Sequence, residues 1–323
     1  MFEQICSTDN LFLAWKRFRK GKRSRKDVME YGRYLEGSLF RLQEELLCES
    51  YRHGEYRPFT VFDPKKRHIH KASVRDRVVH QAIVNVIEPL FERRFIFDSY
   101  SCRVGKGTHA AVRRLRKFLS SVSRNDTRTV YVLKCDVRKF FASVDHDILI
   151  DLLRRSVKDR YAIRLIRNVI GSFETVSGKG LPLGNLTSQL FANVYLHELD
   201  RFMKHDLRVK RYLRYCDDFV IVDRSRRRLE ALLRLISAFT QERLALELHP
   251  DKISVRTWSQ GIDFLGYVLL PHCTILRTKT ARRMTVRAGP DNVSSYLGLC
   301  SHASSFRLRQ LILNRAGLSL DAD

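Results

Sequence analysis

The chain has 323 residues, and 60 lysines and arginines against 35 acidic residues leave a formal charge of +25. A hydrophobic fraction of 44% is that of a folded protein, so the composition excludes a disordered polycation. Arginine outnumbers lysine 43 to 17, and because arginine suits bidentate phosphate contacts, we expect a nucleic-acid partner.

The length predicts two or three subdomains. Apolar runs stay below the ~18 residues that span a bilayer, and the first ten residues lack the layout of a signal peptide. We therefore expect a cytoplasmic protein without a membrane partner. The seven cysteines include no C-x-x-C pair, which argues against a disulfide framework and a zinc site and predicts reduced thiols.

The first distinctive segment, residues 16–26, is strongly basic and contains no acidic residue. Its cations are Lys16, Arg17, Arg19, Lys20, Lys22, Arg23, Arg25 and Lys26. Such a block repels itself unless an anion neutralises it, so we predict nucleic-acid contacts here, with a solvated helix face as the alternative. Apolar residues at helical spacing then predict a single helix over 31–47.

The next elements alternate between loop and helix. Residues 56–72 read as a basic hairpin or loop, and residues 78–95 as a helix. The glycine-rich run 103–109 superficially suggests a phosphate-binding loop, but it fits neither G-x-x-x-x-G-K-[ST] nor G-x-G-x-x-G. It is better interpreted as a helix entry, with Thr108 capping a basic helix that continues to Leu119.

Two acidic positions stand at the ends of predicted strands. The apolar strand 130–135 ends at Asp136, and two further strands, 211–215 and 219–222, flank Cys216, Asp217 and Asp218. This pattern predicts a hairpin with two acids at its tip. Around these elements we expect the following: helices at 145–153, 185–202 and 229–239, a strand pair within 262–270, and a basic, helical C-terminal segment.

Three carboxylates in one compact site would repel one another. At ~4 Å and an effective dielectric near 20, each pair costs roughly 4 kcal/mol, which a divalent cation would offset. Carboxylate oxygens without a neighbouring His or Cys cluster favour Mg²⁺ over zinc. A basic protein with such a site suggests phosphoryl or nucleotidyl transfer. The alternative is an aspartate-rich turn without chemistry. The histidines match no zinc-ligand spacing and are interpreted as structural residues or nucleic-acid contacts.

The order of motifs resembles that of the reverse transcriptases over most of the chain. Asp136 with the following VRKFF resembles motif A, LPLGNLTSQ at 181–189 motif B, and YCDD at 215–218 motif C. LELHPDK at 246–252 is similar to motif D, and GIDFLGY at 261–267 to the primer-contacting motif E. The resemblance implies an α+β right-hand polymerase: fingers within 1–130, a palm with an antiparallel sheet over 131–270, and a short helical thumb over 271–323.

Within that superfamily the sequence most resembles the reverse transcriptases of bacterial diversity-generating retroelements. The GNLTSQ wording of motif B, the small size and the phrase SCRVGKGTHA at 101–110 carry this narrower resemblance. It implies error-prone, adenine-directed copying of a retroelement template RNA into cDNA. Its implied partners are the template RNA, a DNA or RNA primer, deoxynucleoside triphosphates and a small basic accessory protein. A defence-associated or retron-like enzyme and a non-catalytic RNA-binding protein on a polymerase scaffold are the alternatives.

The resemblance also assigns roles to residues. Asp136, Asp217 and Asp218 are the catalytic acids, and Asp136, Val137 and Asp217 form a site for two Mg²⁺ ions, for which Mn²⁺ can substitute. Further residues are expected to contact the incoming nucleotide: Arg67, Lys66, Phe141, Gly184, Gln189 and Lys252. Phe141 would exclude a 2′ hydroxyl, and Lys252 would protonate the leaving pyrophosphate. Phe264, Leu265 and Gly266 of motif E would contact nucleic acid.

Overall fold

The structure is a computed structural model that describes residues 1–62 and 66–318. The chain forms two compact units, each assembled from three separate segments. Unit 1 comprises Met1–Phe97, Val137–Asp206 and Ile236–Leu248. Unit 2 comprises Asp98–Asp136, Leu207–Leu235 and His249–Asp323. The expected boundaries at 130 and 270 do not coincide with these units, and the assignment of fingers, palm and thumb to residue ranges stays a prediction.

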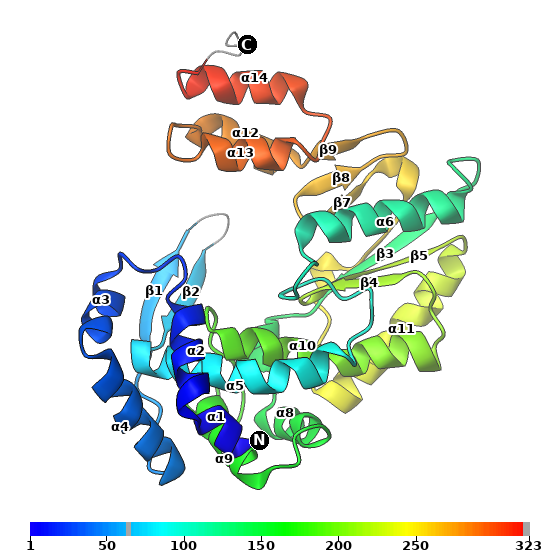
Figure 1. Cartoon of the computed structure of the whole chain (residues 1–323). Helices are drawn as coiled ribbons and strands as arrows, with labels where there is room; N and C mark the ends of the chain where they lie inside the picture. The colour runs from blue at the N-terminus through cyan, green and yellow to red at the C-terminus, as the bar shows by residue number, and fades with distance from the viewer. Residues whose placement is uncertain (63–65, 319–323) are drawn as a thin grey trace. The chain divides into compact units, whose positions relative to one another are not determined.

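Unit 1 is mainly helical. Its helices are α1 (Phe2–Cys6), α2 (Thr8–Phe18), α3 (Lys26–Arg33), α4 (Leu35–Leu47), α5 (Val74–Glu92), α7 (Phe140–Ser143), α8 (His146–Arg154), α9 (Arg160–Gly171) and α10 (Leu186–Arg201). A π-helical turn, Phe202–Asp206, extends α10. The helix α5 is central because it contacts α1, α2, α3 and α10 (Figure 1). Its apolar residues are buried on several sides, which explains why the helix carries apolar side chains nearly all round.

The single helix predicted over 31–47 is wrong, because the chain forms two helices that break at Tyr34. The backbone of Tyr34 leaves the helical region at φ −117° and ψ 36°. The α3 side of the break packs on α2: the rings of Trp15 and Tyr31 lie 5.4 Å apart, and a Cβ added to Gly32 would lie 3.3 Å from the Trp15 ring. Tertiary packing of α3 therefore overrides the continuous helical spacing.

The basic hairpin of unit 1 is confirmed in the residues described. Strands β1 (Arg57–Val61) and β2 (Arg67–Lys71) pair antiparallel, with Arg57 opposite Lys71 and Val61 opposite Arg67. The helix that follows begins at Val74, four residues earlier than expected, because the side chain of Ser73 accepts a hydrogen bond from the Asp76 amide.

Unit 2 is built on two antiparallel sheets. The first has the order β4–β5–β3–β6, formed by Tyr212–Tyr215, Asp218–Asp223, Tyr131–Asp136 and Ser254–Thr257. The second has the order β7–β8–β9, formed by Ile262–Phe264, Tyr267–Leu269 and Thr274–Leu276. The sequence did not predict β6 and β9, since strands of four and three residues are too short to show an apolar period.

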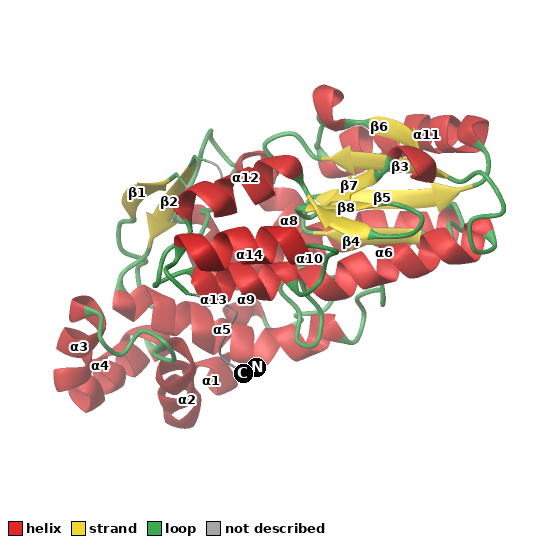
Figure 2. Cartoon of the chain, turned by 90° about the horizontal axis from the view of Figure 1, so that it is seen from above, coloured by secondary structure: helices red, strands yellow, loops and turns green. Residues whose placement is uncertain are grey.

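Helices cover these sheets. The helix α6 (Thr108–Ser123) lies along β4 and β5, and α12 (Thr278–Arg287), α13 (Val293–Cys300) and α14 (Phe306–Arg315) form a group of their own (Figures 1 and 2). One buried apolar cluster joins α6, both sheets and this group. The remaining helix, α11 (Arg226–Leu244), has residues in both units. No helix in the described residues is long and apolar enough to cross a bilayer.

The glycine-rich run 103–109 is the entry to α6, as expected, but Thr108 is not its cap. Gly107 holds the capping position at φ +111°, a conformation that favours glycine, and no side chain caps the helix. Thr108 is the first helical residue, and its hydroxyl lies 3.1 Å from that of Tyr215. The hydroxyl is thus used for a tertiary contact with the end of β4.

Candidate active site

Three aspartates of unit 2 meet at one end of its first sheet, and we call them the acid cluster. Asp136 is the last residue of β3, Asp218 is the first of β5, and the two are direct partners in the antiparallel register. Side chains of such partners start about 4.5–5.5 Å apart at Cβ. Asp217 precedes Asp218 in the two-residue turn that joins β4 to β5. The expected hairpin with acids at its tip is therefore confirmed.

A buried arginine supports this turn. Arg214 of β4 is fully buried, donates from Nη1 to the carbonyl of Cys216 (3.0 Å), and donates from Nη2 to the hydroxyl of Ser99 (3.1 Å). The Cys216 backbone has φ +54°, which a non-glycine residue adopts at a cost. The hydrogen bond from Arg214 to the Cys216 carbonyl stabilises this strained conformation, and thereby fixes the position of the next residue, Asp217.

The electrostatics of the acid cluster oppose full ionisation. Burial and the neighbouring charge of Asp136 raise the pKa of Asp217, with Lys252 opposing. Burial also raises the pKa of Asp218 to about 6; Lys134 opposes this shift, and the charges of Asp136 and Asp217 add to it. One cation contacts the cluster directly, since Nζ of Lys252 lies 2.6 Å from Oδ1 of Asp136.

The donor set of the acid cluster fits Mg²⁺. Hard carboxylate oxygens are the ligands that this ion prefers, and in nucleotide-dependent enzymes it is held by one or two carboxylates together with substrate phosphates. Among the residues described, no group of three or more His, Cys, Asp or Glu side chains forms a ready metal cage.

Several other residues of the sequence prediction lie in unit 1. Gly184 has φ +102°, and a Cβ added there would lie 2.7 Å from Cγ2 of Ile69 on β2. On either side of it, the amide of His70 donates to the carbonyl of Leu183 (3.1 Å), and Nδ2 of Asn185 donates to the carbonyl of His70 (2.9 Å). We call residues 181–185 the motif B turn; it is fastened to β2 at a distance that only glycine allows.

Phe141 also belongs to this part of unit 1. Its carbonyl accepts a hydrogen bond from the amide of Leu181 (2.7 Å), and its ring is half-buried against Phe140. The structure thus brings Phe141, the motif B turn and β2 together. Gln189 is exposed on α10, and Lys66 and Arg67 are exposed at the start of β2.

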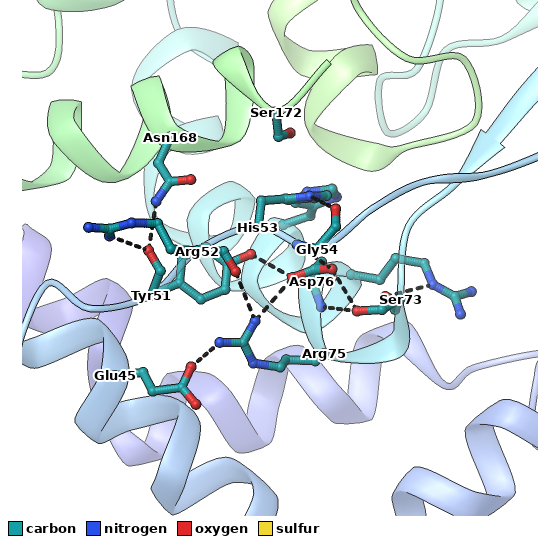
Figure 3. Close-up of polar contacts among 12 residues, drawn as sticks. Glu45, Tyr51, Arg52, His53, Gly54, Ser73, Arg75, Asp76, Asn168 and Ser172 are labelled. Atoms are coloured by element: carbon teal, nitrogen blue, oxygen red, sulfur yellow. Dashed lines mark hydrogen bonds and ion pairs between the residues drawn. The ribbon is translucent and has the colours of Figure 1, made fainter.

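The base of the β1–β2 hairpin is anchored on Asp76 of α5 (Figure 3). This fully buried carboxylate accepts hydrogen bonds from the hydroxyls of Tyr51 (2.8 Å) and Ser73 (2.6 Å) and from the amide of Gly54 (3.3 Å). Arg75 adds an ion pair to it at 3.4 Å and pairs with Glu45 on α4. Gly54 leads into β1 and Ser73 follows β2, so one carboxylate holds both legs of the hairpin.

The predicted nucleic-acid contacts differ in exposure. In the basic block, Lys16, Arg17, Lys20, Arg23 and Arg25 are exposed, whereas Arg19 and Lys22 are half-buried beside the rings of Trp15 and Phe18. In motif E, Leu265 and Gly266 form the β7–β8 turn with positive φ, but Phe264 is fully buried. The side chain of Phe264 therefore supports the turn from within the core instead of forming a contact surface. Val137 is likewise buried, and its backbone pairs with Leu248.

The sequence alone assigns no role of its own to Arg214 or to Asp76, which stands out only as part of Arg75-Asp76-Arg77, a run that resembles a fingers motif. Arg214 is one arginine among 43, and Asp76 lies in a run that alternates charges, R-D-R. A weak signal existed for Asp76, because Ser73-x-x-Asp76 has the spacing of a helix cap. No local signal marks Arg214, since its partners lie in the turn it precedes and 115 residues away.

Comparison with known families decides the class of this site. Residues 62–269 match the family model described as reverse transcriptase (RNA-dependent DNA polymerase). The chain belongs to the reverse transcriptase family. The matched residues include β2, Phe141, the motif B turn, the acid cluster and motif E.

The chain is also similar to curated proteins. The reverse transcriptase is 28% identical to protein YkfC of Escherichia coli over 275 residues, covering 71% of this chain and 70% of that protein. It is 23% identical to the group II intron-encoded protein LtrA of Lactococcus lactis over 297 residues, covering 68% of this chain and 48% of LtrA. The matched region thus spans about half of the length of LtrA.

Solved structures agree on the fold. Telomerase of Candida albicans, in complex with a fragment of telomeric RNA, superposes with a TM-score of 0.55 at 12% identity, covering 81% of this chain and 53% of that one. Apo telomerase of Candida tropicalis gives 0.51 at 13% identity, covering 71% and 55%. The fold of the reverse transcriptase is therefore the expected α+β right-hand polymerase fold.

Proposed function

We propose that this reverse transcriptase copies an RNA template into DNA by adding deoxynucleotides to the 3′ hydroxyl of a DNA or RNA primer. The observation that carries the proposal is the register of β3 and β5, which pairs Asp136 with Asp218 beside Asp217. A binding protein would gain nothing from burying mutually repelling carboxylates, whereas a metal-dependent polymerase requires them.

Roles follow from this arrangement. Asp136 and Asp217, with Val137 beside them, would hold Mg²⁺, for which Mn²⁺ can substitute. The bound ions would activate the 3′ hydroxyl and neutralise the charge of the triphosphate and leaving pyrophosphate. Asp218 would support the site. Lys252, which already contacts Asp136, would position that carboxylate and supply a proton to the pyrophosphate.

The residues of unit 1 would bind the incoming nucleotide. Phe141 would place its ring against the sugar and exclude a 2′ hydroxyl, and Gly184 lets the motif B turn approach without a Cβ. Arg67, with Lys66, would bind the triphosphate, for which an exposed guanidinium is well suited. Gln189 would contact the nascent base pair.

We further propose that the template is a retroelement RNA. The GNLTSQ wording of motif B favours a diversity-generating element, in which copying is error-prone at adenines and a small basic accessory protein takes part. The likeness to an intron-encoded protein favours the second candidate, faithful copying of an intron RNA. The error spectrum separates these two.

The test is primer extension on a defined RNA template with Mg²⁺, comparing wild type with Asp217→Asn. Primer extension should fall by more than roughly 100-fold in this variant. Removing a residue that only hydrogen-bonds to a metal ligand lowers activity by ~10–100-fold, and Asp217 is proposed to be a ligand itself. Asp151→Asn is the matched control, since this aspartate is exposed on α8 and pairs with Arg154 at the surface. Equal extension by Asp217→Asn and wild type would refute the proposal.

Sequencing the extension products completes the experiment. Errors concentrated opposite template adenine would support the diversity-generating role. Evenly distributed, rare errors would support the intron-type role. Tight RNA binding without extension by the wild type, with and without candidate accessory proteins, would instead identify a binding protein.

A further inference from the structure

A cavity of 370 Å³ lies in unit 2, on elements that the acid cluster does not use. Its walls are one face of α6, the strands β8 and β9, and the segment that joins α13 to α14. The residues that matter are His109, Arg113, Arg116, Tyr267 and His302. We call this cavity the histidine pocket.

The histidine pocket is electropositive because Arg113 and Arg116 line it and its lining, among the residues that the structure describes, includes no carboxylate. Arg116 donates to the carbonyls of Leu270 (3.3 Å) and Pro271 (3.0 Å) and to the hydroxyl of Thr274 (3.1 Å). These acceptors are neutral, so they fix the guanidinium without compensating its charge. Arg113 is exposed one turn before it on the same helix face.

Two imidazoles complete the pocket. The ring centroids of His109 and His302 lie 3.7 Å apart, and Nε2 of His109 lies 3.2 Å from the hydroxyl of Tyr267. That hydroxyl donates its proton to the carbonyl of Leu299 (3.0 Å), so it accepts from Nε2–H of His109, and Nδ1 is the free position. Burial first, then His302 and Arg113, lower the pKa of His109.

The neighbouring His302 and Arg113 therefore disfavour a protonated His109 unless an anion joins them. A doubly charged oxyanion would pair with the two guanidiniums and allow Nδ1 of His109 to take a proton and donate it. Carboxylates are weaker candidates, because the pocket offers four cationic or potentially cationic groups and a phosphate presents more acceptor oxygens.

We propose that the histidine pocket binds a phosphate group. The group can come from the backbone of an RNA or from a free phosphate compound, since both present the same oxyanion. The proposal does not rest on polymerisation: the pocket shares Tyr267 with motif E but no residue with the acid cluster, the motif B turn or the hairpin.

The experiment follows the imidazole resonances of His109 by NMR while inorganic phosphate is added at constant ionic strength. The His109→Gln spectrum identifies the signal. We expect phosphate to shift the His109 resonances and to raise the pKa of His109, because a bound dianion favours the charged imidazole. Local resonances are needed because a chain with a charge of +25 binds RNA at many places.

Arg113→Gln tests the pocket without disturbing its frame, because Arg113 is exposed whereas Arg116 holds the β8–β9 turn. Phosphate affinity measured at His109 should fall about fivefold to tenfold in this variant, with an unchanged circular dichroism spectrum. The matched control is Arg227→Gln, which removes the same charge from an exposed position on α11. It should leave the affinity unchanged.

A second arm distinguishes the source of the phosphate. A short single-stranded RNA that shifts the His109 signal and is displaced by inorganic phosphate supports a backbone contact. A response to inorganic phosphate but not to RNA supports a free phosphate compound. No shift with either ligand, or equal shifts in wild type and Arg113→Gln, would overturn the proposal, and none of these readouts depends on polymerase activity.

Discussion

At the scale of single residues, His53 and His80 share one hydrogen bond in the interior of unit 1. Nδ1 of His53 lies 2.6 Å from the carbonyl of Gly54 and donates to it, so its Nε2 accepts from Nε2–H of His80 at 3.0 Å. Nδ1 of His80 is then buried without a partner among the residues described. Burial above all lowers the pKa of His80 to about 3, so the ring is neutral in the folded protein.

This geometry predicts acid sensitivity. In the unfolded chain His80 takes up a proton as the pH falls through its ordinary pKa of 6.5, whereas in the folded chain it does so only near pH 3. The free energy of unfolding therefore decreases as the pH falls from 6.5 towards 3. Between pH 7 and 5 the loss should be about 2 kcal/mol. His80→Gln should remove that part of the pH dependence, as measured by urea unfolding at both pH values.

The matched control is His272→Gln, at an exposed histidine. Its free energy of unfolding should follow the wild-type pH dependence. The prediction fails if His80→Gln loses as much stability between pH 7 and 5 as the wild type does.

At the scale of elements, the motif B turn and β2 touch through Gly184 and Ile69. Gly184→Ala should destabilise the protein by about 1–3 kcal/mol, because the new Cβ meets Cγ2 of Ile69 and alanine is strained at φ +102°. Adding Ile69→Ala should recover the steric part and leave the backbone part. A double-mutant cycle by urea unfolding measures the coupling, which should be near zero if the two residues do not touch.

Asp76 of α5 holds the β1–β2 hairpin in place through its hydrogen bonds. Asp76→Asn should lower the free energy of unfolding by about 3 kcal/mol. The asparagine NH₂ group is a donor, so it cannot accept the hydrogen bonds that the carboxylate oxygen in its place now accepts. Tyr51→Phe removes one donor and should cost about 1 kcal/mol. Asp9→Asn, at an exposed position on α2, is the control and should change little. Equal costs for the variants at Asp76 and Tyr51 would contradict the role of the carboxylate as a shared acceptor.

At the scale of the whole molecule, binding and chemistry should separate when the metal is removed. The charge of +25 attracts RNA without help from the acid cluster. EDTA should therefore abolish primer extension while RNA affinity, measured by fluorescence anisotropy, changes less than about twofold. Raising the salt from 50 to 200 mM should weaken that affinity by at least about tenfold. A loss of RNA binding in EDTA would show that the metal has a structural role.

Much of the fold and of the acid cluster could be predicted from the sequence. The strand ending at Asp136 and the hairpin around Asp217 carry local signals, namely an apolar run and two acids between two strands, and the register of β3 and β5 brings them together. The order of motifs then identified the right-hand fold. These features depend on residues close in the chain, or on a motif order that the family shares.

Features made by distant contacts could not be predicted. The break at Tyr34 depends on the packing of Trp15 against α3. The hydroxyl of Thr108 contacts Tyr215 instead of capping α6. The two compact units are each built from three segments, so no composition shift along the chain marks their limits. Such contacts leave no periodicity in either segment alone.

Because β2 is bound to the motif B turn, we expect that the hairpin cannot be exchanged between relatives on its own. His70 exchanges backbone and side-chain hydrogen bonds with Leu183 and Asn185, and Ile69 fits against the missing Cβ of Gly184. A chimera that imports the hairpin of a relative would bring foreign side chains against a native turn 115 residues away. Grafts that carry residues 55–72 together with 181–185 from the same donor should fold, whereas grafts of the hairpin alone should be poorly tolerated. We therefore expect residues 55–72 and 181–185 to be replaceable only as a pair from one donor, although they lie far apart in the sequence.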